Sequence, residues 1–313
     1  MIAYVVRRLL ATIPVMLVVA VSVFLLLHLT PGDPAAVLAG DNATSDQVAQ
    51  IRARLGLDQP LWWQFVNWAG QLLRGDLGES LFWGRPVLDL VLERAEPTIS
   101  LALTTILVAV VLAVSLGVLA AWQAGSLTDR LVMGFAVLGF SVPVFVVGYV
   151  LILVFANNLR WLPVQGYTPI AEGFGPWLER LVLPSVALGL AYVALIARIT
   201  RAAMLEVLAE DYVRTANAKG VATRPMLLRH ALKNAAVPIV TVVGIGVALL
   251  IGGVVITETV FNIPGIGRLV VDAIQRRDYP IIQGVILVFS AVYVLVNLLV
   301  DLSYTFFDPR IRY

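Results

Sequence analysis

The chain has 313 residues, of which 60% are hydrophobic and 13% charged, and its mean hydropathy is +0.91. A soluble domain is about 45–50% apolar, so the excess indicates a membrane protein. The net charge of only +2 gives no indication of nucleic-acid binding. The absence of cysteine excludes disulfides, thiolate metal sites and thiol nucleophiles.

Six apolar stretches are candidates to cross the bilayer as helices, because about 20 helical residues cross a core of about 30 Å. The predicted spans are Leu9–Leu29, Thr98–Trp122, Leu131–Ala156, Leu181–Ala197, Ala235–Thr257 and Ile281–Val300. The fourth is the shortest, and it extends through Met204 only if Arg198 and Arg201 reach the membrane surface or face the protein interior. The first is too long for the core of a signal peptide and lacks a small-x-small cleavage site, which favours a retained span. Prolines inside the spans can kink them, among them Pro14, Pro143 and Pro184.

Charge predicts that both termini are cytoplasmic. With the N-terminus inside, the cytoplasmic pieces carry twelve Lys and Arg against six acidic residues, and the outer pieces carry ten against fourteen. Cytoplasmic loops are enriched in Lys and Arg. We therefore predict an all-α integral membrane protein with six transmembrane helices, N-in and C-in. Its parts are the N-terminus and first span (1–30), an extracytoplasmic segment (31–96), and a core membrane domain (97–313) with a cytoplasmic loop at 205–234 and an outer loop at 257–280.

The outer segment 31–96 begins with a turn-forming cluster at Thr30–Pro34. A helix is predicted from Ser45, as its N-cap, to about Leu55, with Gly56 as its C-cap. The stretch Leu61–Leu73 then places three tryptophans within seven residues. It is either a binding surface or an amphipathic helix at the membrane interface, and the aromatic-belt composition favours the second.

The cytoplasmic loop 205–234 is polar and basic, so it must fold in water beside the membrane. Asp211 is a suitable start for a short helix and Gly220 a suitable end. Glu210 and Asp211 would lie at the positive end of the helix dipole, and Lys219 near the negative end. The sequence therefore predicts a short, capped helix on the cytoplasmic side.

One face of this helix is narrow enough to enter a groove on another protein. The spacing i, i+3, i+4, i+7 places on that face Tyr212, Thr215, Ala216 and Lys219. A second helix is expected after the glycine, with Thr223 as its cap and a proline in its first turn. An ordinary basic loop is the alternative, and the order capped helix, glycine, capped helix favours docking.

The loop resembles the EAA loop of binding-protein-dependent ABC importers, and most of all that of the B-type permeases of the dipeptide/oligopeptide subfamily. The general pattern is Glu-Ala-Ala, three residues, Gly, then nine residues before Ile-x-Leu-Pro. Ala216, Gly220 and Leu232 match it. Arg214 and Thr215 replace Glu and Ala, a version characteristic of the peptide subfamily, and this removes any role resting on a glutamate at position 214. The remaining departures are His230 for Ile and Lys233 for Pro.

The resemblance extends along nearly the whole chain, in six further motifs that occur in order. They are LTPGDP (Leu29–Pro34), RLGLDQPL (Arg54–Leu61), GDLGES (Gly75–Ser80), SVPVF (Ser141–Phe145), ETVFNIPGIGRL (Glu258–Leu269) and DPRIR (Asp308–Arg312). Several motifs in order are much more specific than one.

The resemblance implies a type I ABC-importer permease fold, multi-pass in the bacterial cytoplasmic (inner) membrane, and a non-catalytic subunit that forms half of a peptide pathway. The implied partners are a second (C-type) permease, one or two ABC ATPase subunits, an extracytoplasmic substrate-binding protein and membrane lipid. No cofactor or metal is expected on this chain, because ATP and Mg²⁺ would bind the ATPase subunits. The residues implied in ATPase coupling are Glu210, Tyr212, Arg214, Thr215, Ala216, Lys219 and Gly220.

The outer loop 257–280 has two interpretations that the sequence does not separate. It either contacts the binding protein and gates the outer mouth, or it is a solvated loop with interfacial anchors. The candidate gate residues are Glu258, Asn262, Pro264, Arg268 and Asp272. The carboxylate of Glu258 is expected either to face the cavity, where it could meet a peptide's ammonium group, or to lie in the headgroup layer.

Two other classes of protein are disfavoured. The two histidines, His28 and His230, fall at opposite ends of the predicted topology, and neither a catalytic motif nor a GxxxxGK nucleotide loop is present. A stand-alone carrier or channel would tend to show internal repeats and midplane charges, which the sequence lacks. Cargo stays open within the subfamily, since relatives carry peptides, glutathione, nickel chelates, opines or sugars.

Overall fold

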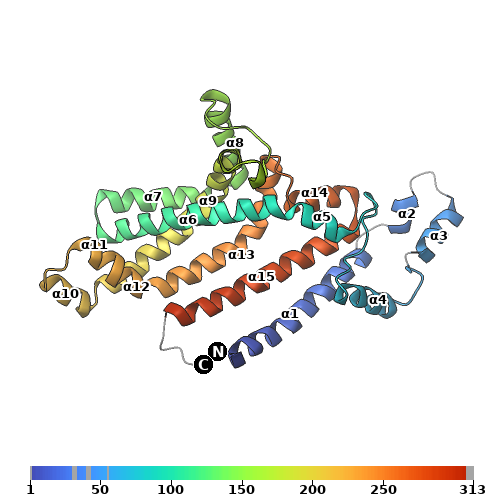
Figure 1. The fold of residues 1–313 in the computed structure, drawn as a ribbon, viewed down its shortest axis with the longest axis horizontal. Helices are drawn as coiled ribbons and strands as arrows, with labels where there is room; N and C mark the ends of the chain where they lie inside the picture. Colours follow the sequence, from blue (N-terminus) through green and yellow to red (C-terminus); the bar gives the residue numbers. More distant parts are fainter. Residues whose placement is uncertain (1, 30–33, 40–43, 55, 308–313) are drawn as a thin grey trace. The chain divides into compact units, whose positions relative to one another are not determined.

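The computed structural model describes residues 2–29, 34–39, 44–54 and 56–307, and these residues form helices and connecting turns without a β-strand (Figure 1). A single antiparallel bridge pairs Glu79 with Pro86. Three sequence motifs are affected by the gaps, since residues 30–33, residue 55 and the whole of 308–312 lie outside the described residues. The longer helices are α1 (Ile2–Leu29), α3 (Ser45–Arg54), α4 (Leu61–Leu73), α6 (Ala95–Trp122), α7 (Leu127–Ser141), α8 (Val144–Leu151), α9 (Phe174–Leu208), α10 (Asp211–Ala218), α13 (Ala236–Val260), α14 (Ile266–Arg276) and α15 (Tyr279–Phe307).

Two compact units make up the chain. Unit 1 contains residues 1–95 and 269–294, and unit 2 contains residues 96–268 and 295–313. Helices α14 and α15 each begin in one unit and end in the other.

The all-helical prediction is confirmed. Four of the described helices are long and apolar enough to cross a membrane: α6, α9, α13 and the part of α15 from Tyr279 to Leu302. Helices α7 and α8 together make a bent fifth candidate, and the apolar stretch Leu10–Leu26 of α1 is shorter. The number of six spans and the N-in/C-in orientation stay predictions.

The third predicted span, Leu131–Ala156, is not one straight helix. It bends by 105° between α7 and the helical segment Val144–Asn158, which comprises α8 and a π-helical turn. Val142 is extended (φ −91°, ψ 127°) and Pro143 follows it. Proline lacks an N–H and pushes the preceding residue out of the helical region, so the helix ends where the sequence places SVP. The predicted span is therefore broken at the proline that the sequence marks as a possible kink.

Helix α9 is the centre of unit 2, and it packs against α7, α8 and α13. In Figure 1, α6, α7, α9 and α13 run alongside one another while α8 is turned away from them, and α10 and α11 (Thr223–Pro225) lie at one end. Small residues allow the close contacts. A Cβ atom on Gly117 of α6 would lie 2.6 Å from Cβ of Thr200, and one on Gly253 of α13 would lie 2.6 Å from Cδ1 of Leu188.

An ion pair joins the start of α7 to the last turns of α9. The guanidinium of Arg201 donates to both carboxylate oxygens of Asp129, from Nε at 2.5 Å and from Nη2 at 2.7 Å. Asp129 also accepts from the backbone N–H of Gly125 in the preceding turn at 2.9 Å. Arg201 thus faces the protein interior, one of the two arrangements that the sequence allowed, whereas Arg198 is exposed.

In unit 1, α4 has the predicted bounds and lies against α1, where the ring of Phe24 is 5.3 Å from that of Phe65 and 5.6 Å from that of Trp68. The N-cap of α3 is Thr44 rather than the predicted Ser45. Thr44 donates its N–H to Oε1 of Gln47, while the N–H of Gln47 donates to Oγ1 of Thr44, which is a reciprocal capping box.

A buried aspartate in unit 1 joins the outer segment to the start of α15. The carboxylate of Asp278 is 1% exposed. It accepts a 2.6 Å hydrogen bond from Ser80 Oγ and a 3.1 Å bond from the N–H of Phe82. The guanidinium of Arg276 stacks 3.9 Å above the ring of Phe82.

Candidate functional site

Helix α10 forms where the sequence predicts a short cytoplasmic helix. It runs from Asp211 to Ala218, with Glu210 in the N-cap position and Lys219 in the C-cap position. Gly220 then has φ +79°, a left-handed conformation that glycine adopts without strain. The predicted start of the helix at Asp211 and its end before Gly220 are confirmed.

One side chain fixes α10 to unit 2. Val213 is 1% exposed and belongs to a buried cluster with Met204, Met226 and Leu227. The hydroxyl of Tyr212 also accepts a 2.7 Å hydrogen bond from Nδ2 of Asn234. The other side chains of the helix are exposed, except that of Ala216.

The outward face differs slightly from the predicted one. Tyr212, Thr215 and Lys219 are exposed, as the docking hypothesis requires, but Ala216 is half-buried. A helix turns about 100° per residue, so the side opposite Val213 is centred on Thr215 and includes Ala218. The backbone N–H of Val221 bonds to the carbonyl of Ala216 and closes the turn on this inner side.

The second helix of the loop is irregular. Ala222, not Thr223, is its N-cap residue, and no side chain bonds the cap. After Pro225 the chain continues as a π-helical turn, Met226–Ala231, before the short helix Leu232–Asn234. The buried residues of this turn complete the cluster that holds α10.

The outer turn, Phe261–Gly265, is built around Glu258. This glutamate is 0% exposed near the end of α13. Its Oε1 accepts a 2.6 Å hydrogen bond from Oγ1 of Thr98, and its Oε2 accepts a 2.9 Å bond from the N–H of Arg268. Oγ1 of Thr98 accepts in turn from the N–H of Ile266 at 2.8 Å. The two side chains therefore cap the N-terminus of α14, where a negative charge also favours the helix dipole.

Glycines make room for this carboxylate. A Cβ on Gly265 would overlap the Glu258 carboxyl group, and one on Gly267 would lie 2.9 Å from its Oε2 and 2.7 Å from Cα of Val255. Asn262 takes a positive φ of 52°, and its Oδ1 accepts a hydrogen bond from Nη1 of Arg268. The turn is thus fixed from inside by Glu258.

The structure corrects the expected position of Glu258. Its carboxylate faces neither a cavity of this chain nor the headgroup layer, because every direction around it is occupied by protein. Asn262 and Pro264 are exposed on the surface of the turn, and Arg268 is half-buried. Asp272, further along α14, is half-buried and belongs to unit 1.

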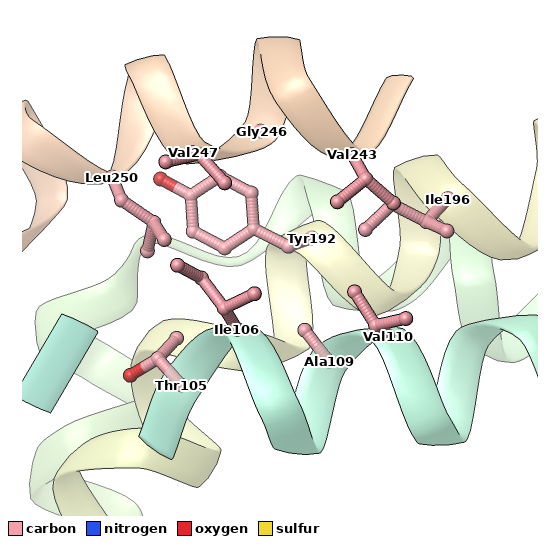
Figure 2. Close-up of a pocket in the computed structure, with 10 residues that line it drawn as sticks. All are labelled: Thr105, Ile106, Ala109, Val110, Tyr192, Ile196, Val243, Gly246, Val247 and Leu250. Carbon is pink, nitrogen blue, oxygen red and sulfur yellow. The ribbon is translucent and has the colours of Figure 1, made fainter. Parts of the chain in front are cut away.

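Inside unit 2, helices α6, α9 and α13 leave almost no space between them. Figure 2 shows a pocket of about 10 Å³ in which the ring of Tyr192 lies between α6 and α13. A single water needs about 10–15 Å³ of this kind of volume, so the three helices are closely packed. Gly246 permits the approach, since a Cβ there would lie 3.4 Å from the Tyr192 ring.

Sequence reasoning missed two polar contacts that position these sites, Asp129 with Arg201 and Thr98 with Glu258. The signal for the first was an arginine inside an apolar helix, which needs an interior partner. Nothing local marks the second, because its two residues are 160 positions apart. The described residues contain no group of three His, Cys, Asp or Glu side chains that could hold a metal ion.

These features define a class: a helical membrane protein with long apolar helices and a short exposed helix fixed at one end of them. Residues 113–313 match the family of inner membrane components of binding-protein-dependent transport systems, and residues 1–102 match the N-terminal region of such components. The chain belongs to this family, whose members are membrane permease subunits.

Relatives agree over the full length. The chain is 61% identical to a probable peptide ABC transporter permease of Sinorhizobium fredii, covering 99% of both chains. It is 44% identical to the glutathione transport system permease GsiC of Escherichia coli K12, covering 100% of both. Among solved structures, it is similar to the inward-facing methionine ABC transporter MetNI, with a TM-score of 0.58 at 16% identity over 71% of this chain and 97% of the other. That likeness shows the fold of an ABC importer permease.

Proposed function

We propose that this chain is one of two permease subunits of an ATP-driven importer of peptides, and that α10 couples it to a partner ATPase. The observation that carries the proposal is the form of α10: Val213 fixes its inner side, while Thr215 and its neighbours stay exposed. A short helix that is packed against the permease on one side and bound by a partner protein on the other can transmit a movement of that partner to the membrane helices.

Packing within unit 2 supports a shared pathway. The contact among α6, α9 and α13 holds about one water at most, far too little for a peptide. Large apolar side chains remain exposed along α7 and α8, among them Leu131, Leu138 and Phe145. We infer that a second permease completes the pathway, while ATP and Mg²⁺ bind the ATPase subunits and an extracytoplasmic binding protein supplies the cargo.

Peptide is the proposed cargo because the relative at 61% identity is a probable peptide permease. The relative at 44% transports glutathione, which is itself a tripeptide, so glutathione is the second candidate. Uptake of a labelled dipeptide by the complete transporter in proteoliposomes, with competition by glutathione, separates the two. ATP-independent uptake by this chain alone would instead identify a carrier.

The coupling role is tested with two tryptophan substitutions on the same helix. Thr215→Trp places a large ring at the centre of the outward face, whereas Asn217→Trp places it on the exposed flank near the side held by Val213. We expect Thr215→Trp to reduce ATPase co-purification and ATP-driven uptake at least tenfold, and Asn217→Trp to leave both near wild type. Normal ATPase association and uptake in the Thr215→Trp transporter would contradict the proposal.

A further inference from the structure

Unit 1 contains a pocket of about 320 Å³. It is bounded by α1, the turn after α3, α4 and the first turns of α15. Its volume lies at the lower end of the range of roughly 300–1,000 Å³ that is typical of small-molecule sites. Neither the family nor the predicted coupling explains why a membrane component should keep such a space.

One wall of the pocket is aromatic. Trp63 and Trp68 of α4 and Phe24 of α1 line it. Phe24 and Trp68 are packed together, whereas Trp63 remains 43% exposed and has the ring of Trp62 against it at 5.3 Å. Its neighbour Trp62 is 65% exposed and does not line the pocket. The tryptophan pair is thus divided between the pocket and the outer surface of α4.

Most of the other lining groups are carboxamides, beside Ala53, Gly56 and Leu57. Trp63, Asn67 and Gln71 recur every four residues and so form one row along α4. No described residue bonds the side-chain amides of Asn67 and Gln71. Gln64 differs, because its amide donates to the carbonyl of Gln59 at 2.7 Å and accepts from a ring nitrogen of His28 at 3.1 Å.

A buried glutamine from α15 completes the lining. Gln283 is only 8% exposed, and its Nε2 donates to the carbonyl of Val23 at 3.1 Å. None of the described residues donates to its Oε1. This oxygen is therefore able to accept a hydrogen bond from a ligand that brings a hydroxyl or N–H.

The charge of the pocket restricts the ligand. None of its described lining residues is ionised. A phosphate or a zwitterionic peptide would bring charges that find no partner there, which is unfavourable when they leave water. Carboxamides both donate and accept, and indole faces pack against apolar C–H surfaces. Together they suit a neutral polyhydroxylated ring.

We propose that this pocket binds a sugar ring, with Trp63 stacking on its face and Asn67, Gln71 and Gln283 bonding its hydroxyls. The proposal is independent of peptide transport and of the role of α10. The same chemistry could come from a free saccharide or from the headgroup of a glycolipid, since α1 and α15 are apolar helices.

The test uses the full transporter, purified in a sugar-free detergent and placed in nanodiscs of phospholipid only. Glucose and maltose are titrated by calorimetry, and a second set of nanodiscs contains glucosyl diacylglycerol, whose retention is measured by mass spectrometry. Trp63→Ala and Gln283→Leu remove pocket groups, and Trp62→Phe, which keeps an aromatic ring against Trp63, is the matched control. Because Trp63 is half-exposed, its removal tests the site even if Gln283→Leu does not fold.

Saturable binding of a free sugar, weakened about tenfold by Trp63→Ala and unchanged by Trp62→Phe, would support a soluble ligand. The same pattern seen only with the glycolipid would support a lipid-borne one. The absence of saturable binding in both sets would overturn the proposal. So would equal loss in the two tryptophan variants, or dipeptide binding in place of sugar binding.

Discussion

Arg201→Met tests how much of the stability of unit 2 depends on the ion pair with Asp129. The substitution keeps the length and apolar stem of the side chain but removes two charge-assisted hydrogen bonds of 2.5 and 2.7 Å. It leaves a carboxylate that is only 6% exposed without its counter-charge. Removing one partner of a buried pair costs about 3–5 kcal/mol. Because Arg201 itself is 27% exposed, we expect the lower end, about 3 kcal/mol.

This loss of stability is measured by thermal unfolding of the purified transporter, with intrinsic tryptophan fluorescence as the signal. For a unit of about 200 residues, 3 kcal/mol lowers Tm by about 6–12 °C. Arg198→Met is the matched control, three residues earlier on α9 and exposed, and it is expected to shift Tm by no more than about 2 °C. In the Asp129→Asn/Arg201→Met double variant, the second substitution should cost much less than it does alone. Equal shifts for Arg201→Met and Arg198→Met, or additive losses in the double variant, would refute the reasoning.

Three further predictions follow from local geometry. Gly220→Ala places a Cβ at φ +79° and should destabilise this turn by about 1 kcal/mol. Coupling to the ATPase should weaken as a result, and Gly220→Asn should partly restore it. The stimulation of ATPase activity by cargo measures the coupling. Gly265→Ala should prevent normal folding, because its Cβ would overlap the Glu258 carboxylate, whereas Gly252→Ala, with nothing within 4 Å, should behave as wild type in size-exclusion profiles. Burial raises the pKa of Tyr167 above its usual 10, so the folded state holds this proton more tightly and loses stability as the pH rises past that value. In an ultraviolet titration, Tyr167→Phe should remove one phenol that ionises late. A titration curve unchanged by this substitution would contradict the prediction.

Local sequence rules were sufficient for the short helices. The bounds of α4 and the ends of α10 follow from signals within a few residues, namely a proline before the first turn and a glycine after the last. Gly220 has the left-handed backbone that such a stop requires. For α3 and for the second helix of the loop, the predicted N-cap residue differs from the observed one by one position.

Three prolines show where local rules fail. Pro14 lies inside α1 and Pro184 inside α9, and both helices continue through them. Pro143 instead separates α7 from α8 at a bend of 105°. The sequence marks all three as possible kinks, and packing decides between them. After the break α8 contacts α9 and α13, and a Cβ on Gly148 would lie only 3.2 Å from the ring of Phe261.

The candidate sites divide in the same way. The exposed face of α10 could be predicted from its spacing, except that the half-buried Ala216 required knowledge of what lies beneath the helix. Glu258 could not be placed, because its partners Thr98 and the N-terminus of α14 are distant in sequence or defined only once the turn has formed. An isolated acid at the end of an apolar stretch resembles a ligand group and a structural cap equally.

The bend at Pro143 has a consequence for how the protein is made. Residues 131–156 contain no charge, so a nascent chain can enter the bilayer there as one straight apolar segment. The contacts that hold α8 at its angle come from α9, which begins at Phe174, and α13, which begins at Ala236. Neither helix exists when residues 131–156 leave the ribosome. Pro143 breaks the helix locally and the contacts with α9 and α13 hold its angle, so we expect segment Val144–Asn158 to reach its final place only when those helices have been synthesised.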